Sequence, residues 1–334
     1  MATSKLPDDF AVFILTHGRP DNVITYKTLQ RCGYTGRLYF VCDNEDKTVD
    51  RYRANFGSER VIVFDKKAEA DLCDEGNNFD ERRTITMARN ACFGIAERLG
   101  VRYFVELDDD YNNFWFELAD AHKRSVPIKQ INNTFANMIK FYKSTKCLSI
   151  AFAQSGDFIG GLDNGKGLYR FNKRKCMNSF LCSTKRPFRF IGAMNEDVNT
   201  YTTAGSRGGL FLTIPFVSVN QTASQSQKGG ITDMYLRYGT YCKAFTTAMM
   251  MPSSVKVSMM NSSNPRLHHS IDWQRTAPCI LRESVKRNHV IVDEYRTEER
   301  AAIYEYDAGL SRDDADRMAQ IPESTIPASK GGAE

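Results

Sequence analysis

The segment TMARNACFGIAERLGVRYFVELDDDY, residues 86–111, decides the fold class of this chain. Around its first half, apolar residues recur at steps of three and four, which places one apolar stripe along a helix. The members of this stripe are Ile85, Ala88, Cys92, Ile95 and Leu99. The second half, RYFVEL, is an apolar run typical of a strand, and it ends in three consecutive aspartates. A helix that leads into a buried strand is the repeating unit of an α/β sheet.

The same alternation precedes this segment. The run FAVFIL, residues 10–15, has the pattern of a strand buried on both faces, and it breaks at the turn THGRPDN. A helix is expected over residues 26–32, followed by strands in GRLYFVCDNED, residues 36–46, and VIVF, residues 61–64. Strands separated by helices in this order predict an α/β fold, with a mostly parallel central sheet flanked by helices.

The rest of the chain continues the pattern less regularly. An amphipathic helix is expected from the spacing of Ile128, Ile131, Phe135, Met138 and Tyr142. Strand patterns follow in LSIAFA, residues 148–153, and GGLFLTIPFVSV, residues 208–219. We interpret residues 1–115 as a nucleotide-binding half and residues 116–300 as an acceptor-binding and catalytic half. Residues 301–334 are expected to form a C-terminal helix and a frayed polar tail.

Composition narrows the class of protein. With 334 residues, of which 42% are hydrophobic, the chain can bury a large core, which favours a soluble enzyme and excludes disorder as the main state. No apolar run reaches the roughly 18 to 20 residues that span a bilayer, and MATSKLPDDF lacks the plan of a signal peptide. We therefore expect a cytoplasmic location and no membrane partner. The nine cysteines contain no CxxC pair, which argues against a disulfide framework or a zinc knuckle.

The acids after the fourth expected strand suggest a metal site. Ligands of such sheets bind beyond the carboxyl ends of the strands, where THGRPDN, DNED and DDDYNN all lie. If the strand continues, Asp108 and Asp110 point the same way. Two carboxylates with a common direction suit Mg²⁺ or Mn²⁺, completed by the phosphates of a substrate. The alternative is an acidic turn without a ligand.

The run of ARN, helix, strand and Asp-x-Asp resembles the glycosyltransferases of the GT-A fold. This resemblance implies that Asp108 touches the ribose of a nucleotide-sugar donor, and that Asp108 and Asp110 hold a divalent metal at its diphosphate. Asp109 would be the variable middle residue.

The resemblance also assigns residues to the base of the donor. The turn after the first strand, with Thr16 and Arg19, and the acid after the second strand, Asp43, would face the nucleotide. Arg89 would be the basic residue of the ARN signature, in the donor site. Its alternative is a solvated arginine on a helix.

A second resemblance lies in FIGAMNEDVNTY, residues 190–201, which is similar to the Glu-Asp signature that opens the acceptor-side helix of these enzymes. It implies that Asp197 is the general base of an inverting transfer, with Glu196 beside it. A carboxylate in that place can take the proton of an attacking hydroxyl group. The alternative is a helix start, with Asn195 as the cap and the acids at the favourable end of the helix dipole.

The segment NPRLHHSIDW, residues 264–273, supplies a third candidate for metal binding. Many GT-A enzymes use a histidine near the end of the catalytic domain as a further ligand, which implies this role for His268 or His269. Neighbouring residues of a strand point to opposite faces, so at most one is expected to ligate. A surface histidine is the alternative for each.

Residues 164–195 contain no acid and eight basic residues. These are Lys166, Arg170, Lys173, Arg174, Lys175, Lys185, Arg186 and Arg189. Aromatic residues are interleaved with them, a combination that suits phosphate contacts and base stacking. The alternative is a solvated basic loop whose aromatic side chains reach into the core.

Residues 10–290 as a whole resemble the glycosyltransferases that bacteriophages encode beside TET/JBP-type dioxygenases. This resemblance implies transfer from a UDP-sugar, UDP-glucose or a relative, to hydroxymethylated pyrimidine in DNA, by a phage protein in the host cytoplasm. A glycan acceptor is one alternative. A sugar nucleotidyltransferase is another, but THGRPDN has only one glycine and one arginine for a phosphate loop. A non-catalytic DNA-binding module would have no use for the acids.

Overall fold

The structure is a computed structural model of the 334-residue chain. It describes residues 5–76, 82–117, 125–154, 176, 178–221, 231–260, 266–278, 280–281, 291–306 and 309–320. The chain divides into two compact units, Met1–Val285 and Lys286–Glu334. The residues predicted to form the site all belong to the first unit.

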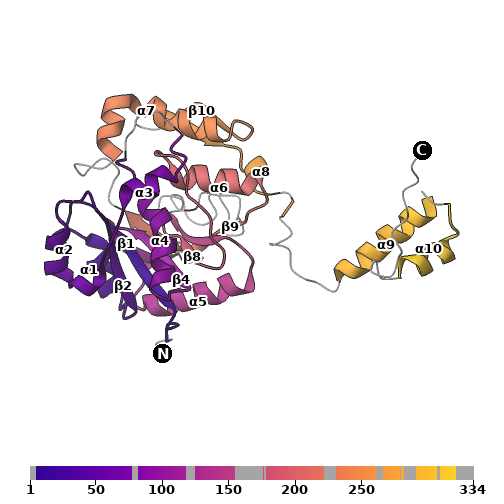
Figure 1. Ribbon diagram of the computed structural model, residues 1–334, viewed down its shortest axis with the longest axis horizontal. Helices are drawn as coiled ribbons and strands as arrows, with labels where there is room; N and C mark the ends of the chain where they lie inside the picture. The colour runs from indigo at the N-terminus through magenta and orange to yellow at the C-terminus, as the bar shows by residue number, and fades with distance from the viewer. Residues whose placement is uncertain are drawn as a thin grey trace. The chain divides into compact units, whose positions relative to one another are not determined.

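The first unit is built on one large sheet (Figure 1). Within the described residues this sheet has nine strands, in the order β3-β2-β1-β4-β8-β7-β9-β5-β6. The strands are β1 Phe10–Leu15, β2 Arg37–Asp43, β3 Val61–Phe64, β4 Tyr103–Asp108, β5 Tyr111–Glu117, β6 Ser125–Pro127, β7 Ser149–Gln154, β8 Leu181–Ser183 and β9 Phe211–Gln221. Strands β1 to β4 are mutually parallel, as are β7 and β9, whereas β8 and β5 run against their neighbours.

Helices cover both faces of this sheet. They are α1 Ile24–Arg31, α2 Val49–Phe56, α3 Lys66–Asp71, α4 Thr86–Arg98, α5 Ile131–Ser144 and α6 Glu196–Ser206, with a 3₁₀ turn, η1, at Ser58–Arg60. The side chains of β1 alternate between two core clusters, which is why all six of its residues are buried. One cluster includes side chains of α1, α2 and α5, and the other includes side chains of α4 and α6. The predicted α/β class, with a mostly parallel central sheet flanked by helices, is confirmed.

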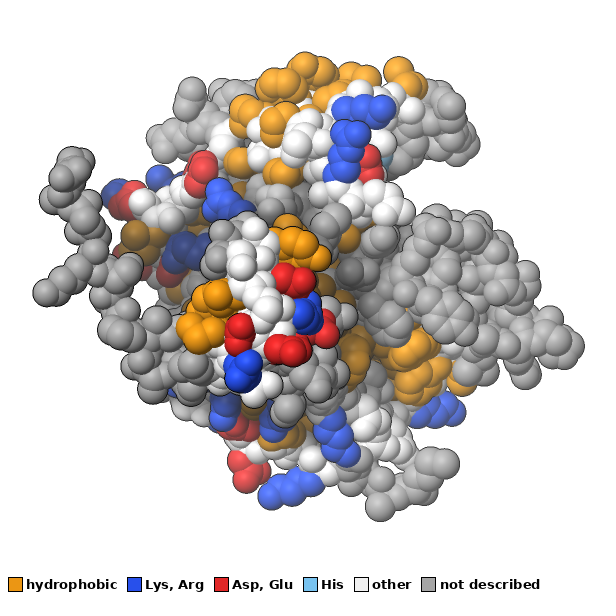
Figure 2. All heavy atoms as spheres, turned by 90° about the vertical axis from the view of Figure 1, so that its right-hand side faces the viewer, with side chains coloured by type: hydrophobic (Ala, Val, Ile, Leu, Met, Phe, Trp, Pro, Cys, Tyr) orange, Lys and Arg blue, Asp and Glu red, His pale blue; other side chains and the backbone are white. Residues whose placement is uncertain are grey.

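The remaining elements of the first unit are α7 Ile231–Met250, β10 Val255–Met260, β11 Arg266–Ile271 and α8 Trp273–Thr276. The helix α7 is kinked at Gly239, whose φ of 79° leaves the helical region. Strands β10 and β11 form an antiparallel pair that packs against α7. Apolar side chains gather at the top of the view in Figure 2, the end of the molecule where Figure 1 shows α7 and β10. Among the described side chains of these two elements, the large apolar ones that are exposed are Tyr241, Phe245, Met249 and Met259.

The second unit contains α9 Ile291–Tyr306 and α10 Arg312–Ala319. Its small core consists of Ala301, Ala315 and Ala319. Ser311 begins α10 as a side-chain cap, because its hydroxyl accepts a hydrogen bond from the backbone of Asp314. In the part of the chain that the structure describes, no helix combines the length and apolar composition needed to cross a membrane.

The backbone around the acids is held by α1. Strand β4 ends at Asp108, and only Asp109 and Asp110 separate it from β5. The hydroxyl of the buried Thr25 donates to the carbonyl oxygen of Asp108 (2.5 Å) and accepts from the backbone N–H of Tyr111 (2.9 Å). The segment DDDYNN is therefore a two-residue connection followed by a strand, and not a longer acidic loop. Strand β5 pairs with β9, on the far side of β8 and β7.

Candidate active site

The turn after β1 is hydrogen-bonded to the middle aspartate. The hydroxyl of Thr16 donates to Asp109 Oδ2 (2.8 Å) and lies 2.8 Å from the hydroxyl of Tyr52. The guanidinium of Arg19 contacts Asp109 Oδ1 at 3.1 Å, and the backbone N–H of Arg19 donates to the hydroxyl of Tyr52 (2.8 Å). Burial raises the pKa of Asp109, while Arg19 and Thr16 act in the opposite direction. These contacts fix the turn of β1 against the end of β4.

The end of β2 carries a second set of charges. The imidazole Nδ1 of His17 lies 2.6 Å from Asp43 Oδ2, and Lys66 Nζ lies 3.5 Å from Asp43 Oδ1. Burial alone would raise the pKa of Asp43, but the hydrogen bond from His17 and the charge of Lys66 lower it below its usual value. The hydrogen bond to Asp43 raises the pKa of His17. Asp43 is thus an ionised acid with a fixed imidazole beside it.

Arg89 lies at the centre of a buried cluster of carboxylates. Its side chain is fully buried on α4, and its guanidinium packs against the rings of both Phe180 and Phe190, which also contact each other. Its guanidinium contacts Asp108 Oδ1 at 2.7 Å, Glu196 Oε1 at 3.2 Å and Glu106 Oε2 at 3.5 Å. It therefore joins the end of β4 to the start of α6. The solvated helix arginine, the alternative considered for this residue, is excluded.

One guanidinium faces three carboxyl groups in this cluster. Burial raises the pKa of Glu106 to about 8, despite the charge of Arg89, so Glu106 is mainly a neutral acid at pH 7. Burial and the charge of Asp197 raise the pKa of Glu196. Asp108 also accepts a hydrogen bond from Asn178 (3.0 Å), which gives its second oxygen a partner. The guanidinium is therefore shared mainly between Asp108 and Glu196.

Asp110 is the second of the two acids that the sequence predicts as metal ligands. Burial and the charges of Asp108 and Asp109 raise its pKa to about 7, and its Oδ2 accepts a hydrogen bond from the amide of Gln221 (3.5 Å). Among the described side chains, no group of three or more His, Cys, Asp or Glu is arranged to hold a metal ion alone. Hard cations such as Mg²⁺ are commonly held by one or two carboxylates and the phosphates of a substrate. Asp108 and Asp110, at the end of β4 and directly after it, are the two carboxylates that such a site would use.

The start of α6 places two acids beside this cluster. Asn195 precedes the helix with φ 56° and ψ 40°, the one left-handed residue other than glycine in the described chain. Its side-chain oxygen does not cap the helix, and its amide nitrogen instead donates to the carbonyl of Lys243 (2.7 Å) and the hydroxyl of Thr247 (3.0 Å) on α7. Glu196 turns to Arg89, whereas Asp197 Oδ1 accepts the backbone N–H of Val198 (2.8 Å). Such a strained residue is typical of functional sites.

The two histidines lie on β11, near the start of α6. His269 is buried, and its Nδ1 lies 3.4 Å from the amide of Asn195. The strand alternation predicts rings on opposite faces, but the ring centroids of His268 and His269 are only 4.2 Å apart. His269 therefore contacts Asn195, the residue that precedes the predicted catalytic acids, and the ring of His268 packs against the ring of His269.

A family model supplies the comparison that decides the class of this protein. The model for TET-associated glycosyltransferase matches residues 10–230, about two thirds of the chain. The chain belongs to this family. Its membership confirms the resemblance found in the sequence, and it makes the protein a glycosyltransferase. No curated protein matches the chain.

Solved structures that resemble this glycosyltransferase are distant. Glucosyl-3-phosphoglycerate synthase from Mycobacterium tuberculosis, in complex with Mn²⁺, UDP and phosphoglyceric acid, is 10% identical with a TM-score of 0.42, over 78% of this chain and 86% of that one. S. aureus TarS 1–349 is 12% identical with a TM-score of 0.37, over 71% of this chain and 64% of that one.

Part of the predicted nucleic-acid surface can be located in this TET-associated glycosyltransferase. Arg170, Lys173, Arg174 and Lys175 lie outside the described residues. Arg186 is used within the fold, since its guanidinium donates to the carbonyls of Tyr142 (3.2 Å) and Cys147 (3.0 Å) at the end of α5. Lys185 is exposed, and Arg189 is exposed with an ion pair to Glu69 (3.1 Å).

Three residues of the site were missed by the sequence analysis. Asp109 was treated as variable, yet its carboxylate is bound by Thr16 and Arg19. The reason is that alternation ends with the strand, so Asp109 need not turn away from the site. His17 and Tyr52 were not considered either. The only signal for His17 was its place inside THGRPDN, while nothing local pointed to Tyr52.

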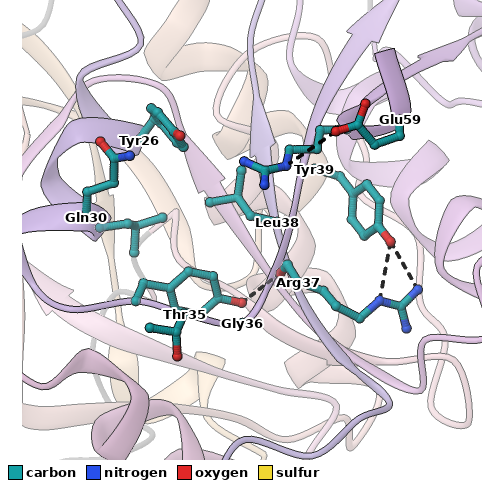
Figure 3. A pocket seen from close by; sticks show the side chains of 11 residues that line it. Tyr26, Gln30, Thr35, Gly36, Arg37, Leu38, Tyr39 and Glu59 are labelled. Carbon is teal, nitrogen blue, oxygen red and sulfur yellow. Dashed lines mark hydrogen bonds and ion pairs between the residues drawn. The ribbon is translucent and has the colours of Figure 1, made fainter. Parts of the chain in front are cut away.

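A pocket lies elsewhere on the first unit (Figure 3). It has a volume of about 480 Å³ and is lined by Tyr26, Tyr34, Arg37 and Tyr39, among others. Tyr34 donates its hydroxyl to the carbonyl of Arg37 (2.7 Å), and the guanidinium of Arg37 donates to Tyr39 (Figure 3). Because this pocket adjoins the start of β2 and the acids follow the strand ends, it is separate from the candidate active site.

Proposed function

We propose that this protein is a metal-dependent, inverting glycosyltransferase that moves a hexose from a UDP-sugar to a hydroxymethylated pyrimidine in DNA. The observation that carries the proposal is the position of Arg89, whose guanidinium contacts both Asp108 and Glu196. Acids assigned to the donor and acids assigned to the acceptor therefore meet in one buried cluster. Transfer requires this proximity, because both substrates must reach one reaction centre.

In the proposed donor site, Asp108 and Asp110 would hold Mn²⁺ or Mg²⁺ together with the diphosphate. The metal would supply positive charge to the departing diphosphate. Thr16 and Arg19 support this site through Asp109, with which they share hydrogen bonds. Asp43 belongs to the nucleoside end of the donor, at the end of β2. Arg89 is a positioning residue in this proposal, because its buried guanidinium contacts acids of the protein.

In the proposed acceptor site, Asp197 is the general base. Its carboxylate takes the proton of the hydroxymethyl group as that oxygen attacks the anomeric carbon. The bond between the anomeric carbon and the diphosphate oxygen breaks, and its electron pair leaves with the UDP. Glu196 fixes the first turn of α6 through Arg89. His269, or His268 beside it, is a further metal ligand in this proposal.

The DNA acceptor rests on the family's association with TET enzymes and on the acid-free segment 164–195. Lys185 and Arg189 are its exposed members in the described chain, with Arg170, Lys173, Arg174 and Lys175 as further candidates. Arg186 anchors this segment to the fold, because its guanidinium donates to the carbonyls of Tyr142 and Cys147. The proposed setting, from the resemblance to phage enzymes, is the cytoplasm of an infected bacterium.

The donor half of the proposal can be tested without knowledge of the acceptor. Hydrolysis of UDP-glucose, and binding of UDP, are measured with Mn²⁺ and with EDTA. We expect both to require the metal and to be lost in Asp110→Ala. Metal-independent UDP binding would refute the assignment of Asp110. Formation of UDP-glucose from UTP and glucose 1-phosphate would instead favour a sugar nucleotidyltransferase.

A further inference from the structure

His17 is held in one orientation at the edge of the sheet where the donor is proposed to bind. Its Nδ1 lies 2.6 Å from Asp43 Oδ2 and 4.0 Å from Asp46 Oδ2. The imidazole is 54% exposed, whereas the Asp43 side chain is 7% exposed. Within the described residues no hydrogen-bond partner is found for the other ring nitrogen, Nε2. The half-exposed imidazole thus has one nitrogen on a buried acid and the other without a partner in the described structure.

The two acids next to this ring, Asp43 and Asp46, already have protein partners for their carboxylate oxygens. Asp43 Oδ1 accepts the backbone N–H of Glu45 (3.1 Å) and lies 3.5 Å from Lys66 Nζ. Asp46 Oδ2 accepts the backbone N–H of Gly18 (2.8 Å), and its side chain is 1% exposed. Neither carboxylate has a free, accessible oxygen for a base. Asp43 therefore acts on a ligand through His17.

The turn that carries His17 is also fixed on both sides. Thr16, which precedes it, bonds to Asp109 and Tyr52, and the backbone N–H of Arg19 donates to Tyr52. Gly18 adopts a φ of 71°, a conformation that favours glycine. A ring held by its own turn and by a buried acid loses little conformational freedom on binding.

The position of His17 selects the part of the donor that it can reach. His17 lies on the turn after β1, which is next to β4, but its ring contacts Asp43 at the end of β2. Strand β2 is two places from β4 in the sheet, so the ends of β2 and β4 are separated by about 10 Å at the usual spacing of about 4.8 Å per strand. A diphosphate at Asp108 and Asp110 would extend its nucleoside toward β2. His17 is placed for the base and not for the phosphates.

We propose that His17 is a specificity residue that donates an Nε2–H hydrogen bond to a carbonyl oxygen of the donor's base, with Asp43 as the acid that holds the ring. This inference rests on the proposed function. It predicts a preference for bases with a carbonyl oxygen, such as uracil, over adenine, which has none.

The protonation of His17 gives the proposal a pH dependence. The hydrogen bond to Asp43 raises the pKa of His17, and the charges of Asp43 and Asp46 add to this, against the effects of burial and of Lys66. The imidazolium donates from both nitrogens, whereas the neutral ring held through Nδ1–H to Asp43 can only accept at Nε2. The preference for a nucleobase with a carbonyl oxygen is therefore complete below the ordinary pKa of histidine, and it is lost as the pH rises through the raised pKa of His17.

The test is calorimetric titration of the full chain with UDP and with ADP, in Mn²⁺, at pH 6.0 and pH 8.5. The ratio of the two affinities is compared, because metal binding by the acids affects both nucleotides alike. We expect His17→Ala to reduce the preference for UDP by about tenfold at pH 6.0, the effect of one hydrogen bond to a charged group on a half-exposed site. His17→Gln, which retains an N–H donor, is expected to keep part of the preference and to lose its pH dependence. The matched control is Lys47→Ala, which removes one exposed positive charge from the neighbouring loop.

Three results would overturn the proposal, and they differ in meaning. If His17→Ala binds UDP and ADP as the wild type does, while Asp110→Ala loses metal-dependent binding, then the donor site exists but His17 does not read the base. If the wild type binds neither nucleotide in Mn²⁺, the proposed function itself fails, and this inference fails with it. If Lys47→Ala loses as much of the preference for UDP over ADP as His17→Ala does, the effect comes from the overall positive charge of this region and not from a hydrogen bond of His17.

Discussion

Replacing Arg89 by methionine tests the buried cluster that joins the two sets of acids. The guanidinium contacts Asp108 at 2.7 Å, Glu196 at 3.2 Å and Glu106 at 3.5 Å, and none of it reaches solvent. Methionine fills most of the volume but leaves Asp108 and Glu196 buried without a cation. Breaking a buried ion pair from one side costs about 3 to 5 kcal/mol, because the remaining charge is uncompensated. The neutral Glu106 and the hydrogen bond from Asn178 to Asp108 favour the lower part of this range.

The assay is urea unfolding followed by circular dichroism at pH 7.5. The control is Arg98→Met, the same substitution at an exposed position of the same helix, for which a change within about 0.5 kcal/mol is expected. Combining Arg89→Met with Glu196→Gln removes one of the stranded charges, so the double variant should be more stable than Arg89→Met alone. A loss below about 1 kcal/mol in Arg89→Met, or no recovery in the double variant, would refute the reasoning.

Three further predictions concern the separate roles of the site. Asp110→Ala should abolish Mn²⁺-dependent UDP binding, which calorimetry measures. At pH 8, above the Asp110 pKa of about 7, thermal unfolding should show the variant to be at least as stable as the wild type, because a charged acid repelled by its neighbours has been removed. Asp197→Asn should retain UDP binding and lose about 10²- to 10⁴-fold in turnover, and equal loss of both would indicate a structural role. Alanine at three basic residues should flatten the salt dependence of DNA binding by about 2 to 3 units and leave UDP-glucose hydrolysis intact. These residues are Lys173, Arg174 and Lys175.

The strands next to the site could be predicted because burial on both faces leaves a continuous apolar run. This holds for β1, β2 and β4, and the stripe along α4 was equally clear. The carboxyl edge of a parallel sheet then places the ends of these strands together, which predicted the neighbourhood of Thr16, Asp43 and Asp108.

The order of the remaining strands could not be predicted, because their pairings are distant in sequence. Strand β5 follows β4 after two residues, but it pairs with β9. Nothing local indicates that β8 and β7 lie between them.

The contacts of Arg89 were equally hidden from the sequence. An arginine beside an apolar stripe looks solvated, and only the fold brings Glu106, Asp108 and Glu196 to its guanidinium. Asn195 shows the same limit. Its residue type predicts a helix cap, but contacts with α7 override that local preference and hold it in the left-handed region.

The central claim is sugar transfer to hydroxymethylated DNA, and a labelled-sugar transfer assay tests it most directly. UDP-glucose labelled in the sugar is supplied with Mn²⁺ and one of four acceptors: unmodified DNA, hydroxymethylcytosine DNA, hydroxymethyluracil DNA, or simple glycans. We predict label only on hydroxymethylated DNA, faster on single-stranded or mismatched sites than on perfect duplex, because a buried carboxylate reaches a base that has left the stack. We also predict inversion at the anomeric carbon and loss of transfer in Asp197→Asn. Efficient labelling of glycans, with no label on any DNA, would contradict the claim.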